Sequence, residues 1–287
     1  NSGQVFLVNQ AQGFNWQDYT VHDKVHPNKA GAEKMATVWF EALKKVLASS
    51  DTVFSPEIVR YKTLEDGDSL ALHIFKPRNM QAGEKRPAIV YFFGGGWKLG
   101  TPIQFYRECA YYASKGMVAV SVDYRIGYLH HSTPFESFED AKDAICWLRS
   151  HASDYQLDPD KIAVAGGSAG GHLAAALGTI GSDETVPAGY RPNLSVLYYP
   201  VIDMVSRGYG FPEIKRDFEK ISPIHHVSEA TPSTLILLGT KDPIVSVETI
   251  EAYQDKLLQK GVDCELHLFE GAGHPIFLYR KPLTEEY

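Results

Sequence analysis

The chain has 287 residues, of which 44% are hydrophobic and 12% aromatic, and its formal net charge is −7. This length suffices for one large domain, or for one domain with an appendage. The negative charge leaves no basic stripe for phosphates, and no apolar run reaches the about 18 to 20 residues that a bilayer crossing needs, so we expect neither a nucleic acid nor a membrane as partner.

The first fifty residues form a segment of their own. "VHDKVHPNKAG" holds Asp23 and His26, residue types that can close a hydrolytic triad, yet nothing upstream is placed to supply a nucleophile. Apolar residues at i, i+3 and i+4 spacing over 29–47 predict an amphipathic helix. Small polar residues and a proline follow and indicate a linker. We therefore divide the chain into an N-terminal segment, 1–54, and a main domain, 55–287.

The main domain alternates between apolar runs and helical patterns. The runs are rich in β-branched or aromatic residues and lie at 70–77, 87–93, 117–124, 161–166, 194–200, 233–239 and 264–270. The helical patterns lie at 140–152, 168–178 and 247–261. Nearly continuous apolar strands separated by helices predict an α/β fold, with a mostly parallel central sheet covered on both faces. We expect the earliest strands to pair as a hairpin.

The sequence "KIAVAGGSAGGHLAAALG" predicts a nucleophile at Ser168. Residues 166–170 match G-x-S-x-G, with a predicted strand before them and a small-residue helix after them. A serine on so tight a turn takes strained backbone angles, and side chains two residues to either side would collide with the neighbouring strand and helix. Steric crowding at this turn therefore explains why glycines stand on both sides of Ser168.

Another predicted strand ends in "YFFGGGWKLG", whose three glycines let backbone N–H groups approach a substrate oxygen closely. We predict an oxyanion hole formed by the N–H groups of Gly95, Gly96 and Ala169. Asp242 and His274 follow the last two predicted strands, in the order that a triad beginning with Ser168 requires. His274 would take the serine proton, and Asp242 would fix the imidazole tautomer.

The combination of "GGGW", "SVDYRI", "GGSAGG", "GTKDP" and "GAGHP" resembles the α/β-hydrolase superfamily, in its hormone-sensitive-lipase-like branch. It is most similar to bacterial acetyl or feruloyl esterase-like proteins that act on carbohydrate. The resemblance spans about residues 55–287 and implies a serine carboxylic-ester hydrolase that forms an acyl-enzyme on short-chain esters, with no cofactor and no metal. One departure is Phe93, where many members carry histidine before the glycine triplet.

Residues 1–50 resemble a different family, the SGNH or GDSL-type hydrolases, because Asp23 and His26 match the end of such a domain. We interpret the segment as a remnant of an SGNH-type domain and a possible partial cap. Gly67-Asp68-Ser69 also spells the GDS nucleophile motif. Charged residues precede it and a strand follows, so we predict a hairpin turn there instead.

For other residues near these motifs we expect structural roles. Trp97 and Tyr124 are expected as core or as wall of the substrate pocket. Cys109, Cys146 and Cys264 have no metal-site spacing and are expected to be buried free thiols.

Several alternatives and consequences stay open at this point. A serine peptidase shares the fold and triad but usually carries a propeller, for which the chain shows no repeats. A non-catalytic small-molecule receptor typically lacks the histidine. A short insertion at 203–228 predicts an accessible pocket for small acyl groups. The short C-terminal end makes a homodimer conceivable, and a polysaccharide substrate would imply secretion or a periplasmic location, with a cytoplasmic one otherwise.

Overall fold

The computed structural model describes residue 34 and residues 55–180, 188–204 and 217–275. The chain divides into two units, 1–55 and 56–287, and the second contains the central sheet and the helices that cover it. Lys34 is helical. The rest of the predicted N-terminal helix, Asp23 and His26 lie outside the described residues, as do residues 205–216 of the predicted insertion and residues 276–287.

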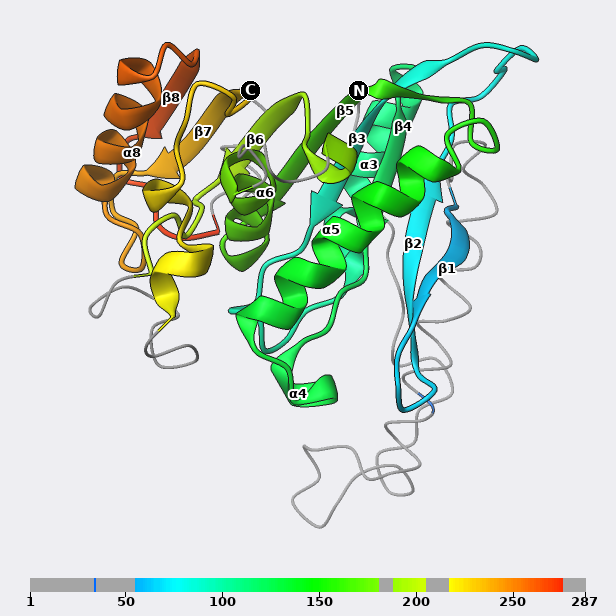
Figure 1. Ribbon diagram of the computed structural model, residues 1–287, viewed down its shortest axis with the longest axis horizontal. Coiled ribbons are helices and arrows are strands. Elements are labelled where there is room, and N and C mark those ends of the chain that lie inside the picture. Colours follow the sequence, from blue (N-terminus) through cyan, green and yellow to red (C-terminus); the bar gives the residue numbers. More distant parts are fainter. Residues whose placement is uncertain (1–33, 35–54, 181–187, 205–216, 276–287) are drawn as a thin grey trace. The chain divides into compact units, whose positions relative to one another are not determined.

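Eight strands of the described region form one sheet, in the order β1-β2-β4-β3-β5-β6-β7-β8 (Figure 1). They are β1 (Glu57–Thr63), β2 (Ser69–Phe75), β3 (Arg86–Phe92), β4 (Val118–Val122), β5 (Leu157–Gly167), β6 (Leu194–Tyr198), β7 (Ser233–Gly239) and β8 (Cys264–Phe269). The pairs β1/β2 and β2/β4 are antiparallel and the other five pairs are parallel. The predicted mostly parallel sheet is confirmed. The hairpin forms between β1 and β2, whereas the two earliest predicted runs, β2 and β3, do not pair because β4 lies between them.

Helices cover both faces of the sheet. They are α3 (Tyr106–Ser114), α4 (Gly127–His130), α5 (Pro134–Ser150), α6 (Ala169–Thr179) and α8 (Val247–Gln259), with short 3-10 turns η1 (Pro102–Phe105), η3 (Ala188–Tyr190), η4 (Phe218–Ile221) and η5 (Pro223–His225). The connection from β3 through α3 to β4 crosses the sheet in the opposite direction from the connections that contain α5, α6 and α8. Because such crossovers are right-handed, α3 lies on one face of the sheet and the other three helices lie on the other. Figure 1 shows α5 and α6 crossing in front of the strands.

The core lies between these layers and holds the central strands. All five residues of β4 are buried, as two-sided coverage of a parallel strand requires. Edge strand β1 has no fully buried residue. The GDS sequence is a hairpin turn, as predicted: the Gly67 N–H donates to the Leu64 carbonyl at 3.0 Å, and Ser69 pairs with Thr63.

Two further properties concern the described helices and cysteines. No described helix combines the length and the apolar composition that a membrane crossing requires. The three cysteines are free, but only Cys109 is buried, since Cys146 is exposed and Cys264 is half-buried. The prediction of three buried thiols was therefore wrong for Cys146, because amphipathic α5 presents that side chain outward.

Candidate active site

The turn between β5 and α6 presents Ser168. Its backbone angles are φ 55° and ψ −118°, a region that residues with a side chain rarely adopt. Packing holds the strained turn from both sides, since the Ser168 N–H donates to the Tyr198 carbonyl at 3.0 Å and its carbonyl accepts from the His172 N–H at 2.9 Å. The hydroxyl therefore leaves the sheet at the carboxyl edge of the central strands.

Glycines permit this turn for a steric reason that the structure makes explicit. A Cβ atom on Gly170 would lie 2.0 Å from the Phe92 carbonyl oxygen, and one on Gly166 would lie 2.4 Å from the Gly170 carbonyl oxygen. Both positions are far inside van der Waals contact. The first and last glycines of the motif are thus required by the close approach of α6 to β3 and β5.

Three predicted residues meet at this edge although they are far apart in the chain. The Ser168 Oγ lies 2.9 Å from the His274 Nε2, and the His274 Nδ1 lies 2.7 Å from the Asp242 Oδ2. Asp242 follows β7 and His274 follows β8. Parallel strands end at one edge of the sheet, so three residues that follow different strands come together there. His274 stands in the middle and bonds both Ser168 and Asp242.

The environment of Asp242 keeps this carboxylate ionised. Its side chain has no exposed surface, and that burial raises the pKa of Asp242. The hydrogen bond to His274 and the N–H groups of Val245 and Ile244, which bond Oδ1 at 3.0 and 2.8 Å, outweigh burial and leave the pKa below its ordinary value. An ionised Asp242 holds a proton on the His274 Nδ1, so Nε2 is free to accept the serine proton.

The second predicted element is the oxyanion loop, residues 94–100, which follows β3. Gly95, Gly96 and Trp97 have φ values of 135°, 62° and 57°. A Cβ atom on Gly95 would lie 2.0 Å from the Leu99 carbonyl oxygen, so no other residue fits there. Gly95 and Gly96 line the same cavity as Ser168. The N–H of Ala169 belongs to the first turn of α6, directly after the nucleophile.

A cavity of about 300 Å³ opens beside the serine. Its walls are Gly94, Gly95, Gly96, Leu99, Gln104, Ser168, Tyr199, Ile244, His274 and Pro275. The Tyr199 ring meets the His274 imidazole edge-on, with 4.7 Å between ring centroids. Gln104 and Tyr199 were not predicted as site residues, because neither belongs to a recognisable motif.

Two predicted pocket residues do not line this cavity. Trp97 is 1% exposed and packs against His172, and Tyr124 is fully buried. Tyr124 stacks on Phe93, with ring centroids 4.1 Å apart, and its hydroxyl donates to the Phe93 carbonyl at 2.6 Å. Both aromatic residues lie in the core, because the oxyanion loop turns its glycine backbone, and not the side chain of Trp97, toward the cavity.

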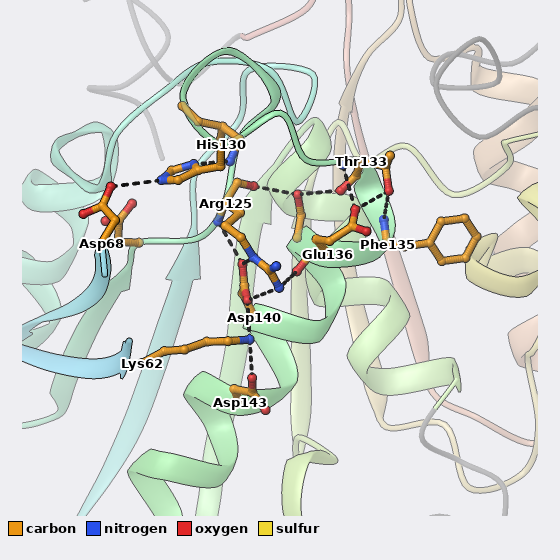
Figure 2. A network of polar contacts seen from close by, with 12 residues as sticks. Lys62, Asp68, Arg125, His130, Thr133, Phe135, Glu136, Asp140 and Asp143 are labelled. Carbon is orange, nitrogen blue, oxygen red and sulfur yellow. Dashed lines mark hydrogen bonds and ion pairs between the residues drawn. The ribbon is translucent and has the colours of Figure 1, made fainter. Parts of the chain in front are cut away.

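A second buried carboxylate, Asp140 on α5, is held by cations (Figure 2). Arg125 donates to both of its oxygens at 2.8 Å through Nε and Nη2, and Lys62 donates to Oδ1 at 2.6 Å. Asp143 takes a further bond from Lys62 at 2.5 Å. Figure 2 shows that this network joins the β1 end to the segment after β4 and to α5.

In the part of the chain that the structure describes, no group of three or more histidine, cysteine, aspartate or glutamate residues is arranged to hold a metal ion. The hydrogen-bonded series from Ser168 to Asp242 needs none, since a general base activates the hydroxyl directly.

The part of the chain that carries Ser168 matches a protein family. The sequence profile of the family described as BD-FAE covers residues 72–216, which begin within β2 and include β3 to β6 and the turn with Ser168. The chain belongs to the BD-FAE family. This membership confirms the predicted resemblance to esterases of the α/β-hydrolase superfamily.

Similar proteins add detail to the BD-FAE assignment. Esterase LipC of Mycobacterium tuberculosis is 28% identical over 223 residues, covering 67% of this chain and 53% of LipC. An acetylxylan esterase of Xylanibacter ruminicola is 26% identical over 227 residues, covering 74% of this chain and 44% of that protein. The chain spans about half the length of the curated relatives it matches.

A solved structure similar to this BD-FAE chain is esterase 2 of Thermogutta terrifontis. It is 35% identical, with a TM-score of 0.73, and the match covers 81% of this chain and 91% of the esterase. The same esterase has been solved with propionate or butyrate bound and after phosphoramylation by tabun. The similarity confirms the predicted α/β-hydrolase fold.

Proposed function

We propose that this chain is a serine carboxylic-ester hydrolase that acts through an acyl-enzyme on short-chain esters. The observation that carries the proposal is the continuous hydrogen bonding from Ser168 through His274 to Asp242 beside a cavity with a glycine loop on its wall. Relatives named as esterases, among them one that binds propionate and butyrate, support it. Catalysis is assigned to residues 55–287, and 1–54 remain the proposed remnant of an SGNH-type domain.

The chemistry follows from the geometry. The Ser168 Oγ attacks the ester carbonyl carbon while the His274 Nε2 takes the hydroxyl proton. The N–H groups of Gly95, Gly96 and Ala169 stabilise the negative oxygen that forms. The C–O bond to the alcohol then breaks, and His274 gives its proton to the leaving oxygen. Water repeats the sequence on the acyl-serine, releasing the acid and restoring the hydroxyl.

The proposed substrate class is an acetyl or aromatic acyl ester of a carbohydrate. A cavity of about 300 Å³ is at the small end for ligand sites, which favours a short acyl group. The similarity to an acetylxylan esterase supports the sugar part of the proposal. On this basis the alcohol extends from the cavity toward solvent.

Two measurements test the proposal. Wild type should hydrolyse p-nitrophenyl acetate and release acetate from an acetylated xylo-oligosaccharide, and Ser168→Ala should lower kcat about 10⁴-fold or more. Undiminished turnover by Ser168→Ala would exclude the nucleophile. A preference for p-nitrophenyl decanoate over acetate would contradict the short acyl site, and cleavage of peptide anilides in place of esters would favour a peptidase.

A further inference from the structure

One contact of the oxyanion loop lies outside the triad and its predicted donors. The Gly94 N–H donates to the Gln104 Oε1 at 2.6 Å. Gln104 belongs to the short turn η1, and its side chain reaches back to the cavity wall beside Ser168. Because the partner is an N–H donor, the amide must present its oxygen there, which fixes the orientation of Gln104.

The loop needs such a contact because its own conformation is unfavourable. Gly95, Gly96 and Trp97 all have positive φ, and at φ 57° tryptophan occupies the left-handed region that residues with a side chain disfavour. The far end of the loop is held, since Gly127 and Tyr128 donate to the carbonyls of Trp97 and Lys98 at 2.8 and 3.1 Å. The near end is held through Gly94. Phe93, directly before it, contributes stacking on Tyr124 but no side-chain hydrogen bond.

Gln104 is itself supported from the core. The Ser121 hydroxyl, fully buried on β4, donates to the Pro102 carbonyl at 2.7 Å and fixes the first residue of η1. Phe105, next to Gln104, is 4% exposed and stacks on Tyr91 with ring centroids 4.8 Å apart. The amide oxygen therefore stands on a rigid base built from two strands, and Gly94 is positioned against that base.

We propose that Gln104 is a positioning residue for the oxyanion hole, an inference that rests on the proposed esterase function of this site. By accepting the Gly94 N–H, Gln104 fixes where the peptide planes of Gly95 and Gly96 point. Their N–H groups then face the position where the carbonyl oxygen becomes negative. Gln104 acts through Gly94 on the transition state, so its loss lowers kcat more than it raises KM.

Three variants test the inference. Gln104→Met keeps length and volume but removes the acceptor, Gln104→Glu keeps an acceptor oxygen, and Ile103→Ala is the matched control on η1, where Ile103 is 65% exposed. We expect Gln104→Met to lower kcat on p-nitrophenyl acetate about 10- to 100-fold with KM changed less than about threefold. Ile103→Ala should change neither.

Hydrogen exchange followed by mass spectrometry supplies a readout that does not depend on activity. The peptide covering residues 94–100 should exchange faster in Gln104→Met than in wild type, whereas Gln104→Glu and Ile103→Ala should keep wild-type protection. If Gln104→Met folds poorly, the protection in Gln104→Glu decides the matter: faster exchange in that variant would overturn the role of the acceptor.

The outcomes separate this inference from the proposed function. Wild-type kcat and exchange in Gln104→Met would overturn the role of Gln104, while Ser168-dependent hydrolysis would still support the esterase. An inactive wild type would overturn the esterase proposal, and with it the positioning role in catalysis. Unchanged protection of residues 94–100 in Gln104→Met would additionally show that this contact does not hold the loop.

Discussion

Asp140 and Asp242 each have a side chain with no exposed surface, but their partners differ in kind. Asp140 bonds the cationic side chains of Arg125 and Lys62. Asp242 bonds the imidazole of His274 and two backbone N–H groups. The first arrangement joins segments of the chain, whereas the second fixes a proton position on a group that must exchange protons.

The electrostatic consequences follow the same division. The hydrogen bonds to Asp140 raise the pKa of Arg125 above its ordinary value, so Arg125 stays charged. A third carboxyl group, Asp123, shows the opposite shift from Asp242: burial raises its pKa to about 6, although the charge of His130 and the Tyr124 N–H act to lower it. Burial is therefore followed by a lowered pKa at Asp242 and by a raised pKa at Asp123, and the partners of each carboxyl group decide the direction.

The largest effect is expected for Asp242→Asn. The N–H groups of Ile244 and Val245 require an oxygen at the Oδ1 position, so the new amide must direct its NH₂ group toward His274. The proton then moves to Nε2, which can no longer accept from Ser168. We expect kcat on p-nitrophenyl acetate to fall about 10⁴-fold.

The pH dependence of stability is a second readout for Asp242→Asn. Because the folded pKa of Asp242 is lowered, its ionised form stabilises the fold above its unfolded pKa of about 4, and this contribution is lost as pH falls through the folded pKa. Urea unfolding of wild type and variant should therefore converge at acid pH. A kcat of Asp242→Asn close to that of wild type would exclude Asp242 as the acid of the triad.

A smaller effect, on stability instead of catalysis, is expected for Asp140→Asn. The change leaves Arg125 and Lys62 without their buried counter-charge, and removing one partner of such a pair costs about 3–5 kcal/mol of unfolding free energy. Urea unfolding measures it. The kcat of the folded fraction should stay within about threefold of wild type.

Glu139→Gln is the matched control for Asp140→Asn on α5. Glu139 pairs with Lys142 at 2.7 Å, but 57% of its side chain is exposed, so its loss should cost less than about 0.5 kcal/mol. Equal effects of the two substitutions would show that the Asp140 network is no stronger than a surface pair.

The smallest effect, of opposite sign, is expected for Asp123→Asn. A pKa raised from 3.8 to about 6 means that the folded state binds the proton more tightly, so wild-type stability falls as pH rises from about 4 to about 6. Asparagine removes that penalty, which is at most about 3 kcal/mol. The variant should unfold at higher urea than wild type at pH 8 and at a similar concentration at pH 4.

Asp68→Asn is the control for Asp123→Asn, since 66% of the Asp68 side chain is exposed. Its unfolding midpoint should follow wild type at both pH values. A lower midpoint for Asp123→Asn at pH 8 would mean that the Asp123 carboxylate has a stabilising partner.

Sequence patterns predicted the central fold because its strands are buried on both faces. Seven apolar runs correspond to β2 to β8, whereas β1 gave no signal because its residues are mostly exposed or half-buried. Helix α3, "YRECAYYAS", was also missed, and it is short and buries only Cys109 and Ala113. Apolar patterns report burial, which explains why β1, with no fully buried residue, was missed.

The candidate site divides in the same way. Ser168, Asp242 and His274 could be placed from sequence because glycine spacing and strand ends constrain the backbone. Gln104 could not, because its role depends on the loop folding back at Gly100, where a Cβ atom would lie 2.5 Å from the Gly94 carbonyl oxygen. For Trp97 the sequence left core and pocket wall open, because an aromatic residue beside a glycine loop can face either side, and only the φ angles of the loop decide which.

The position of His274 beyond β8 has a consequence for biosynthesis. Strand β8 is an edge of the described sheet and pairs with β7 alone, while Ser168 lies near the middle of both the sheet and the chain. Chains emerge from the ribosome N-terminus first. Ser168 is therefore synthesised more than a hundred residues before its general base, His274. It lacks that base until β8 pairs with β7 and completes the described sheet.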